Sequence, residues 1–204
     1  MNINQRIKNY YSKKSKFSIA MDIVFVLFII SLIIPQSRIE VMAFVQKIRV
    51  VIWNPSINDK GTANKLGTLD YDIQFQSLDG KNYNFSSAKG KVIFLNMWAT
   101  WCPPCVAEMP AIQELYDKYK NNENIEFLMV TTDDHQKVMQ FVKRKGYTFP
   151  VYFNQYRLPD AFQFNSLPTT FVVSKSGEVI INQVGAANWS GDKMIETLDR
   201  LIRE

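Results

Sequence analysis

Cysteine and histidine are scarce in this 204-residue sequence, which has two cysteines and one histidine. The small number of cysteines excludes a secreted fold stapled by several disulfides, because such folds carry more cysteines along the chain. A structural zinc site needs about four Cys or His ligands, so we expect no metal, and we expect no other cofactor. A disulfide between Cys102 and Cys105 would close a very short loop and add little stability, so chemistry is the better reason for the pair.

Low-complexity tracts and internal repeats are also missing. The chain is 47% hydrophobic and 21% charged, which is typical of a globular protein. Its length is enough for one ordinary domain with a hydrophobic core and some additional sequence.

The net charge of +5 does not indicate a nucleic-acid-binding surface. Five cations precede the first apolar run, and no acidic residue lies among them: Arg6, Lys8, Lys13, Lys14 and Lys16. Without them the basic and acidic side chains are equal in number, so no basic face remains for a nucleic acid. The cations fit a cytoplasmic N-terminus, residues 1–16, beside a membrane.

The one long apolar run, from Phe17 to Ile34, contains a single charge, Asp22, and ends at Pro35. Its 18 residues suit one helical crossing of a hydrocarbon core about 30 Å thick. We therefore predict a transmembrane anchor over residues 17–35, with the rest of the chain exported. A cleaved signal peptide is the alternative, but no small-x-small cleavage site follows directly. A core helix of a soluble domain fits the upstream cations less well.

Residues 36–68 are predicted to form a juxtamembrane segment and linker. Residues 38–53 are apolar with scattered charge, and they suit either an element on the membrane surface or one packed on the folded domain. Residues 54–68 are rich in Asn, Gly and Ser and indicate a linker.

Residues 69–204 are predicted to form an α/β domain with a central mixed sheet and helices on both faces. The strands are identified by apolar runs and turn signals, and the helices by apolar spacing and capping residues. The predicted strands are 72–78, 82–85, 91–97, 125–131, 150–153, 170–174 and 179–184. The predicted helices run from the Cys102 motif to about 120, from Asp133 or Asp134 to about 145, over 159–164 and over 192–203.

The motif Cys102-Pro103-Pro104-Cys105 follows a buried strand and opens a helix. At a helix N-terminus, free N–H groups and the helix dipole favour the thiolate of Cys102, while Cys105 lies one turn further on and is shielded. Cys102 can then attack a disulfide, and Cys105 can resolve the mixed disulfide. Pro103 and Pro104 stiffen the turn. Half of a zinc site is the alternative for an isolated Cys-x-x-Cys, but the chain has no second ligand pair.

The stretch VIFLNMWATWCPPCVAEMP, residues 92–110, closely resembles the TlpA/ResA-like branch of the thioredoxin superfamily. The resemblance extends over roughly residues 69–204 and implies a thioredoxin-like fold outside the cytoplasmic membrane. It further implies that Trp101, Leu167 and Pro168 contact substrate, that Pro168 is cis, and that Gly185 ends the last strand. A β-bulge or an edge position is the alternative explanation for Pro168, since X–Pro bonds are cis in only about 5% of cases.

Two polar residues, Asn96 and Glu108, are expected near the motif. Asn96 occupies the strand position where cytoplasmic thioredoxins have a buried acid, and an amide cannot take over its proton transfer. Glu108 resembles the acid that this branch places beside its active site. It could accept the proton of Cys105 if burial raises its pKa. The alternative is an ordinary Glu in the first turns of a helix.

The resemblance implies an enzyme that reduces disulfides in exported proteins, with apocytochrome c as a common substrate in the family. It also implies a membrane thiol reductant that returns the enzyme to its reduced state. The compartment is the periplasmic or extracytoplasmic side of a bacterial cytoplasmic membrane. The same dithiol could instead oxidise or isomerise substrates. A thiol peroxidase fits less well. Such enzymes have Thr or Ser three residues before the reactive cysteine, and Ala99 occupies that position here. A thioredoxin-like binding module without catalysis is a further alternative.

Overall fold

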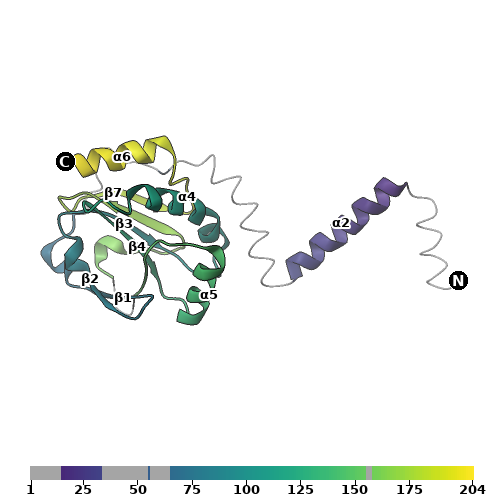
Figure 1. The fold of residues 1–204 in the computed structure, drawn as a ribbon, viewed down its shortest axis with the longest axis horizontal. Coiled ribbons are helices and arrows are strands. Elements are labelled where there is room, and N and C mark those ends of the chain that lie inside the picture. Colours follow the sequence, from purple (N-terminus) through teal and green to yellow (C-terminus); the bar gives the residue numbers. More distant parts are fainter. Residues whose placement is uncertain (1–14, 34–54, 56–64, 155–157) are drawn as a thin grey trace. The chain divides into compact units, whose positions relative to one another are not determined.

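The computed structural model describes residues 15–33, 55, 65–154 and 158–204, and Figure 1 traces the chain. The chain separates into two compact units, residues 1–41 and 42–204, which we describe individually. The predicted element over residues 38–53 and most of the predicted linker lie outside the described residues.

The described part of the first unit is helix α2, Lys16–Ile33. Large apolar side chains along it, from Phe17 to Ile30, are exposed. The predicted helix is therefore present. Within the residues that the structure describes, no helix is both long enough and apolar enough to cross a membrane. The last two residues of the predicted span, Ile34 and Pro35, are not among them.

The second unit is built on a seven-stranded mixed sheet with the order β2-β1-β5-β4-β3-β6-β7. Strands β3, β4 and β5 are parallel, and the remaining pairs are antiparallel. The strands are β1 (Gln74–Ser77), β2 (Asn82–Asn84), β3 (Val92–Met97), β4 (Ile125–Thr131), β5 (Val151–Phe153), β6 (Thr169–Val173) and β7 (Val179–Val184). This is the predicted mixed sheet, with every predicted strand present.

The three longer helices of this unit lie on one face of the sheet. Phe94, Asn96 and Trp98 alternate along β3 and its end, so they share a face. They contact, in turn, Trp189 before α6, Glu108 of α4 and Phe141 of α5. The helices are α4 (Pro103–Tyr119), α5 (His135–Lys145) and α6 (Asp192–Arg203).

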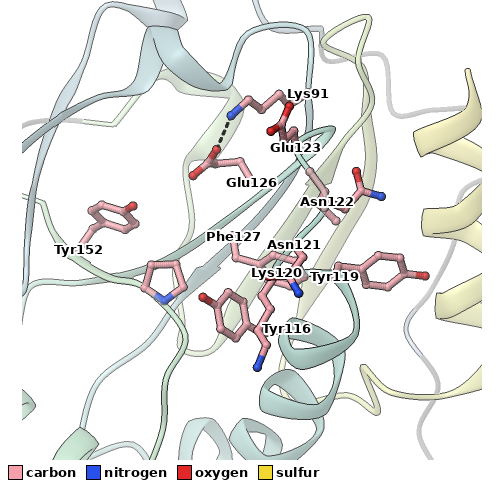
Figure 2. Close-up of a pocket in the computed structure, with 12 residues that line it drawn as sticks. Lys91, Tyr116, Tyr119, Lys120, Asn121, Asn122, Glu123, Glu126, Phe127 and Tyr152 are labelled. Atoms are coloured by element: carbon pink, nitrogen blue, oxygen red, sulfur yellow. Dashed lines mark hydrogen bonds and ion pairs between the residues drawn. The ribbon is translucent and has the colours of Figure 1, made fainter.

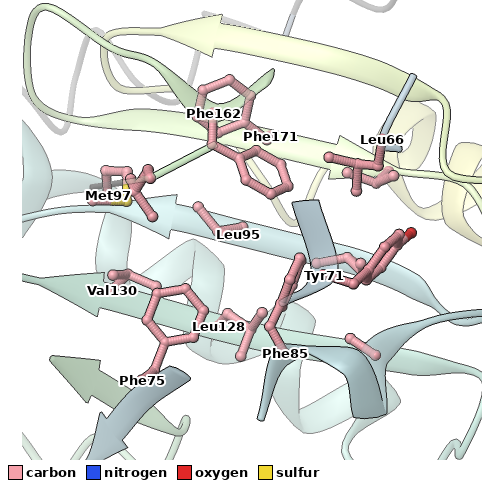
Figure 3. Packing of buried hydrophobic residues seen from close by; sticks show 14 of the residues in the cluster. Leu66, Tyr71, Phe75, Phe85, Leu95, Met97, Leu128, Val130, Phe162 and Phe171 are labelled. Carbon is pink, nitrogen blue, oxygen red and sulfur yellow. The ribbon is translucent and has the colours of Figure 1, made fainter. Parts of the chain in front are cut away.

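Short 3₁₀ helices cover the opposite face. Ile93, Leu95 and Met97 of β3 point to this side, where they join a core with Tyr71, Phe85 and Phe162 (Figure 3). These aromatic residues come from η1 (Thr68–Tyr71), η2 (Phe85–Ala88) and η3 (Asp160–Phe162). The expectation of helices on both faces is therefore correct only in part. Right-handed β3-α4-β4 and β4-α5-β5 crossovers that progress in one direction place both helices on the same face.

Helix ends follow the predicted local signals. The Asp134 carboxylate caps α5 by accepting a hydrogen bond from the backbone N–H of Lys137 at 3.0 Å. Gly146 ends this helix with φ +70°, in the left-handed region that favours glycine. The helix predicted over residues 159–164 is the shorter 3₁₀ helix η3. Leu66, in the predicted linker, is buried in the core and donates a backbone hydrogen bond to Gly177.

Candidate active site

The central strand β3 carries the chain to the motif. All six of its residues are buried, and the backbone N–H of Trp98 continues the pairing by donating to Val130 of β4. A turn follows, in which the backbone N–H of Cys102 donates to Ala99 at 3.2 Å. Cys102 is the N-cap of α4, with the prolines at its first two positions. Proline fits there because the first helical N–H groups have no partner inside the helix.

Cys102 and Cys105 form a disulfide, with 5.3 Å between their Cα atoms. The backbone N–H of Cys105 donates to the Cys102 sulfur at 3.3 Å. Cys102 is 4% exposed and Cys105 is fully buried, so Cys102 is the more accessible of the two sulfurs. An N–H donor and a helix N-terminus both favour negative charge on the Cys102 sulfur once the disulfide is reduced.

Thr100 anchors the turn before the motif. Its backbone N–H donates to the Asp133 carboxylate at 3.0 Å, and its hydroxyl donates to the same oxygen. Asp133 is itself fixed, because its backbone N–H donates to the Thr131 hydroxyl at 3.1 Å. The loop after β4 therefore holds the loop after β3. The sequence indicated Asp133 only as a candidate helix cap.

The predicted substrate-contacting residues lie at the same end of the sheet as the motif. Pro168 is cis and immediately precedes Thr169, which pairs with Met97 at the end of β3. Its carbonyl accepts a hydrogen bond at 2.9 Å from Gly185, which follows β7 and has φ +85°. Leu167 is half-buried, and Trp101 is 61% exposed beside the first cysteine. The predicted cis bond is confirmed, while substrate contact stays a prediction.

Glu108 is fully buried on the first turns of α4 and is held by three donors. The Asn96 side-chain amide donates to Oε1 at 2.8 Å. The backbone N–H of Ala187 and the indole N–H of Trp189 donate to Oε2 at 3.1 and 2.8 Å. Burial raises the pKa of Glu108 to about 7, although the three hydrogen bonds act in the opposite direction. The raised pKa is what proton acceptance at neutral pH requires.

Asn96 connects this carboxylate to the strand that carries Pro168. The same amide nitrogen donates to the Thr170 hydroxyl at 2.8 Å, so its two hydrogens are both used. Sequence reasoning noted Asn96 and Glu108 but missed Thr170, Ala187 and Trp189. A large aromatic residue in the polar segment before the last helix was the available signal for Trp189.

We find no candidate metal site in the part of the chain that the structure describes. That part contains no cluster of three His, Cys, Asp or Glu residues that could hold a metal ion. His135 is exposed, lies near the Leu78 carbonyl at 3.0 Å and stacks on Phe153.

A pocket of about 500 Å³ lies away from the dithiol. It is formed where α4 ends and β4 begins, whereas the dithiol is at the start of α4. Figure 2 shows Tyr116, Phe127 and Tyr152 in it, with the Lys91–Glu126 ion pair at one side. None of the predicted site residues lines this pocket.

A mixed sheet, a dithiol at a helix N-terminus and a cis-proline at the same sheet edge together define a thioredoxin-like thiol–disulfide oxidoreductase. The chain belongs to the Redoxin family, whose profile matches residues 57–202.

Curated proteins similar to this chain are named thiol-disulfide oxidoreductases. The chain is 39% identical over 120 residues to the thiol-disulfide oxidoreductase ResA of Geobacillus kaustophilus, covering 58% of this chain and 68% of that one. It is 32% identical over 141 residues to ResA of Halalkalibacterium halodurans, covering 68% and 78%. The solution structure of a putative thioredoxin from Neisseria meningitidis has a TM-score of 0.54 and 31% identity, covering 65% and 88%. The chain is thus a thiol–disulfide oxidoreductase similar to ResA.

Proposed function

We propose that this chain is a membrane-tethered reductase for disulfides in exported proteins. The observation that carries the proposal is the arrangement around α4. A dithiol caps its N-terminus, and a buried carboxylate with a pKa of about 7 lies one turn beyond Cys105 on the same helix. Residues at i and i+3 lie on the same face of a helix, so Cys105 and Glu108 are neighbours.

In the proposed reaction the Cys102 thiolate attacks one sulfur of a substrate disulfide. A mixed disulfide forms, and the other substrate sulfur leaves as a thiolate. Glu108 accepts the proton of Cys105, whose thiolate then attacks the Cys102 sulfur and releases the second substrate thiolate. The substrate gains two electrons, and Cys102 and Cys105 become a disulfide. A membrane thiol reductant returns two electrons and completes the cycle.

The proposed place of action is the outer side of a bacterial cytoplasmic membrane. Five cations precede the apolar run, and α2 exposes large apolar side chains along its length. Both features suit an N-terminus inside the cell and an exported domain. The haem-binding cysteines of apocytochrome c are a substrate class of suitable chemistry, because they must be reduced in that compartment.

The variant Cys105→Ala tests the catalytic cycle. We expect it to accumulate mixed disulfides between Cys102 and its substrates, because the resolving thiol is missing. Full-length protein is expressed in bacteria, free thiols are blocked by alkylation, and membrane and soluble fractions are compared on non-reducing gels. Reducible adducts should appear in the membrane fraction and contain exported proteins. If the variant forms no adducts, the proposed catalytic cycle is wrong. If the adducts contain cytosolic proteins and appear in the soluble fraction, the proposed location outside the membrane is wrong.

The reduction potential tests the direction of the reaction. We expect a value below about −250 mV, since a reductase must be a stronger reductant than its substrates. The potential is measured by equilibrating the protein with glutathione buffers and following the tryptophan fluorescence. A value near −120 mV, typical of strong oxidants, would instead indicate that the chain oxidises substrate thiols.

A further inference from the structure

Trp189 lies in the segment between β7 and α6, and its side chain is fully buried. Its ring packs edge-on against Phe94 of β3, with 5.2 Å between the ring centroids. The indole N–H donates to Oε2 of Glu108 at 2.8 Å. A tryptophan 81 positions away in the sequence is therefore in direct contact with the proposed proton acceptor.

The donors around Glu108 are divided between its two oxygens. Asn96 donates to Oε1, while Ala187 and Trp189 donate to Oε2. All three groups are pure donors toward the carboxylate, so they favour its charged form and fix its orientation. Among these donors, the indole can be removed without changing the backbone or the contact with Thr170.

The segment that carries Trp189 also contacts the cis-proline. It begins with Gly185, whose N–H donates to the Pro168 carbonyl at 2.9 Å. Two residues later the Ala187 N–H, and four residues later the Trp189 indole N–H, donate to the Glu108 carboxylate. One short segment therefore joins the residue predicted to contact substrate and the residue proposed to accept a proton.

We propose that Trp189 is a positioning residue, whose indole N–H holds the buried Glu108 carboxylate in the orientation that accepts the Cys105 proton. This inference rests on the function proposed for Glu108. Trp189 acts through the Glu108 carboxylate alone.

The variant Trp189→Phe tests the inference, because it keeps an aromatic ring against Phe94 and removes the N–H. Full-length protein in detergent is labelled with ¹³C at its Glu carboxyl groups, and the Glu108 signal, assigned with Glu108→Gln, is titrated by NMR. We expect the titration midpoint of the Glu108 carboxyl group to rise by about one pH unit or more, since a hydrogen bond to its charged form is lost. The pH at which the rate of disulfide reduction rises should increase by the same amount.

The matched control is Trp98→Phe. Trp98 is equally buried, but its indole N–H has no hydrogen-bond partner among the described residues. Its replacement should leave the Glu108 midpoint unchanged. If Trp189→Phe misfolds, replacing the Trp189 indole by the isosteric benzothiophene removes the N–H with the ring volume kept. An unchanged midpoint, or an equal shift in Trp98→Phe, overturns the inference.

Failure of the inference can be told from failure of the proposed function. The carboxyl midpoint reports the contact between Trp189 and Glu108 directly. The rate at which Cys105 resolves a mixed disulfide reports proton acceptance, and Glu108→Gln should lower that rate. If Glu108→Gln leaves the rate unchanged while Trp189→Phe shifts the midpoint, the proton-acceptor role is overturned and only the contact stands.

Discussion

Cys102→Ser reduces protein disulfides no faster than they exchange without enzyme; this is the largest functional effect that we expect from a single substitution. A serine hydroxyl is not ionised at neutral pH and does not attack a disulfide, whereas a thiolate does. The remaining thiol cannot substitute for it, because Cys105 is fully buried. Reduction of a peptide disulfide by the pre-reduced full-length protein, followed by the appearance of free thiol, measures the effect.

Cys105→Ser is the matched control for this experiment. It retains the attacking thiol at the start of α4, so it should consume one equivalent of peptide as a mixed disulfide and then stop. In this variant Cys102 should also react with iodoacetamide at pH 7 faster than free cysteine, because a helix N-terminus favours the thiolate form. Substantial reduction by Cys102→Ser, or a Cys102 thiol no more reactive than free cysteine, would contradict the assignment of the nucleophile.

The elements that the sequence predicted best are those with strong local patterns. Strands Ile125–Thr131 and Val179–Val184 and helix Asp192–Arg203 have the predicted bounds. Continuous apolar runs and the spacing of apolar residues along a helix identify such elements without knowledge of their neighbours. The dithiol was equally clear, since its chemistry depends on four adjacent residues and the start of one helix.

The parts that sequence reasoning missed depend on contacts between distant segments. Trp189 and Glu108 are 81 positions apart, and Thr100 and Asp133 are 33 apart. No periodicity or spacing indicates such hydrogen bonds, which exist only because the sheet order brings these segments together. The short η1 and η2 helices were missed for a similar reason, because their aromatic residues are buried by the tertiary core.

Glu108→Gln should remove a pH dependence of stability that the wild-type protein has in its disulfide state. The folded pKa of Glu108 is about 7, above its ordinary value of 4.5. Folding therefore favours the protonated carboxyl, and the resulting stability is fully present below pH 4.5. It is lost as the pH rises to 7, by a total of roughly 3 kcal/mol in the free energy of unfolding. Urea unfolding at pH 4.5 and pH 8, followed by tryptophan fluorescence, measures the loss.

Glutamine is the informative replacement because the site can accept it. Its carbonyl can take the hydrogen bonds of Ala187 and Trp189, and rotation of the Asn96 amide lets that side chain accept from the new NH₂ group. The Thr170 hydroxyl can then donate to the Asn96 oxygen, so the contacts of Asn96 with residue 108 and Thr170 are both kept. Exposed Glu114 on the same helix provides the control, since Glu114→Gln should leave the pH dependence as it is. If Glu108→Gln retains the wild-type loss between pH 4.5 and pH 8, a different group causes it, and Glu108 is not the buried acid that ionises near neutral pH.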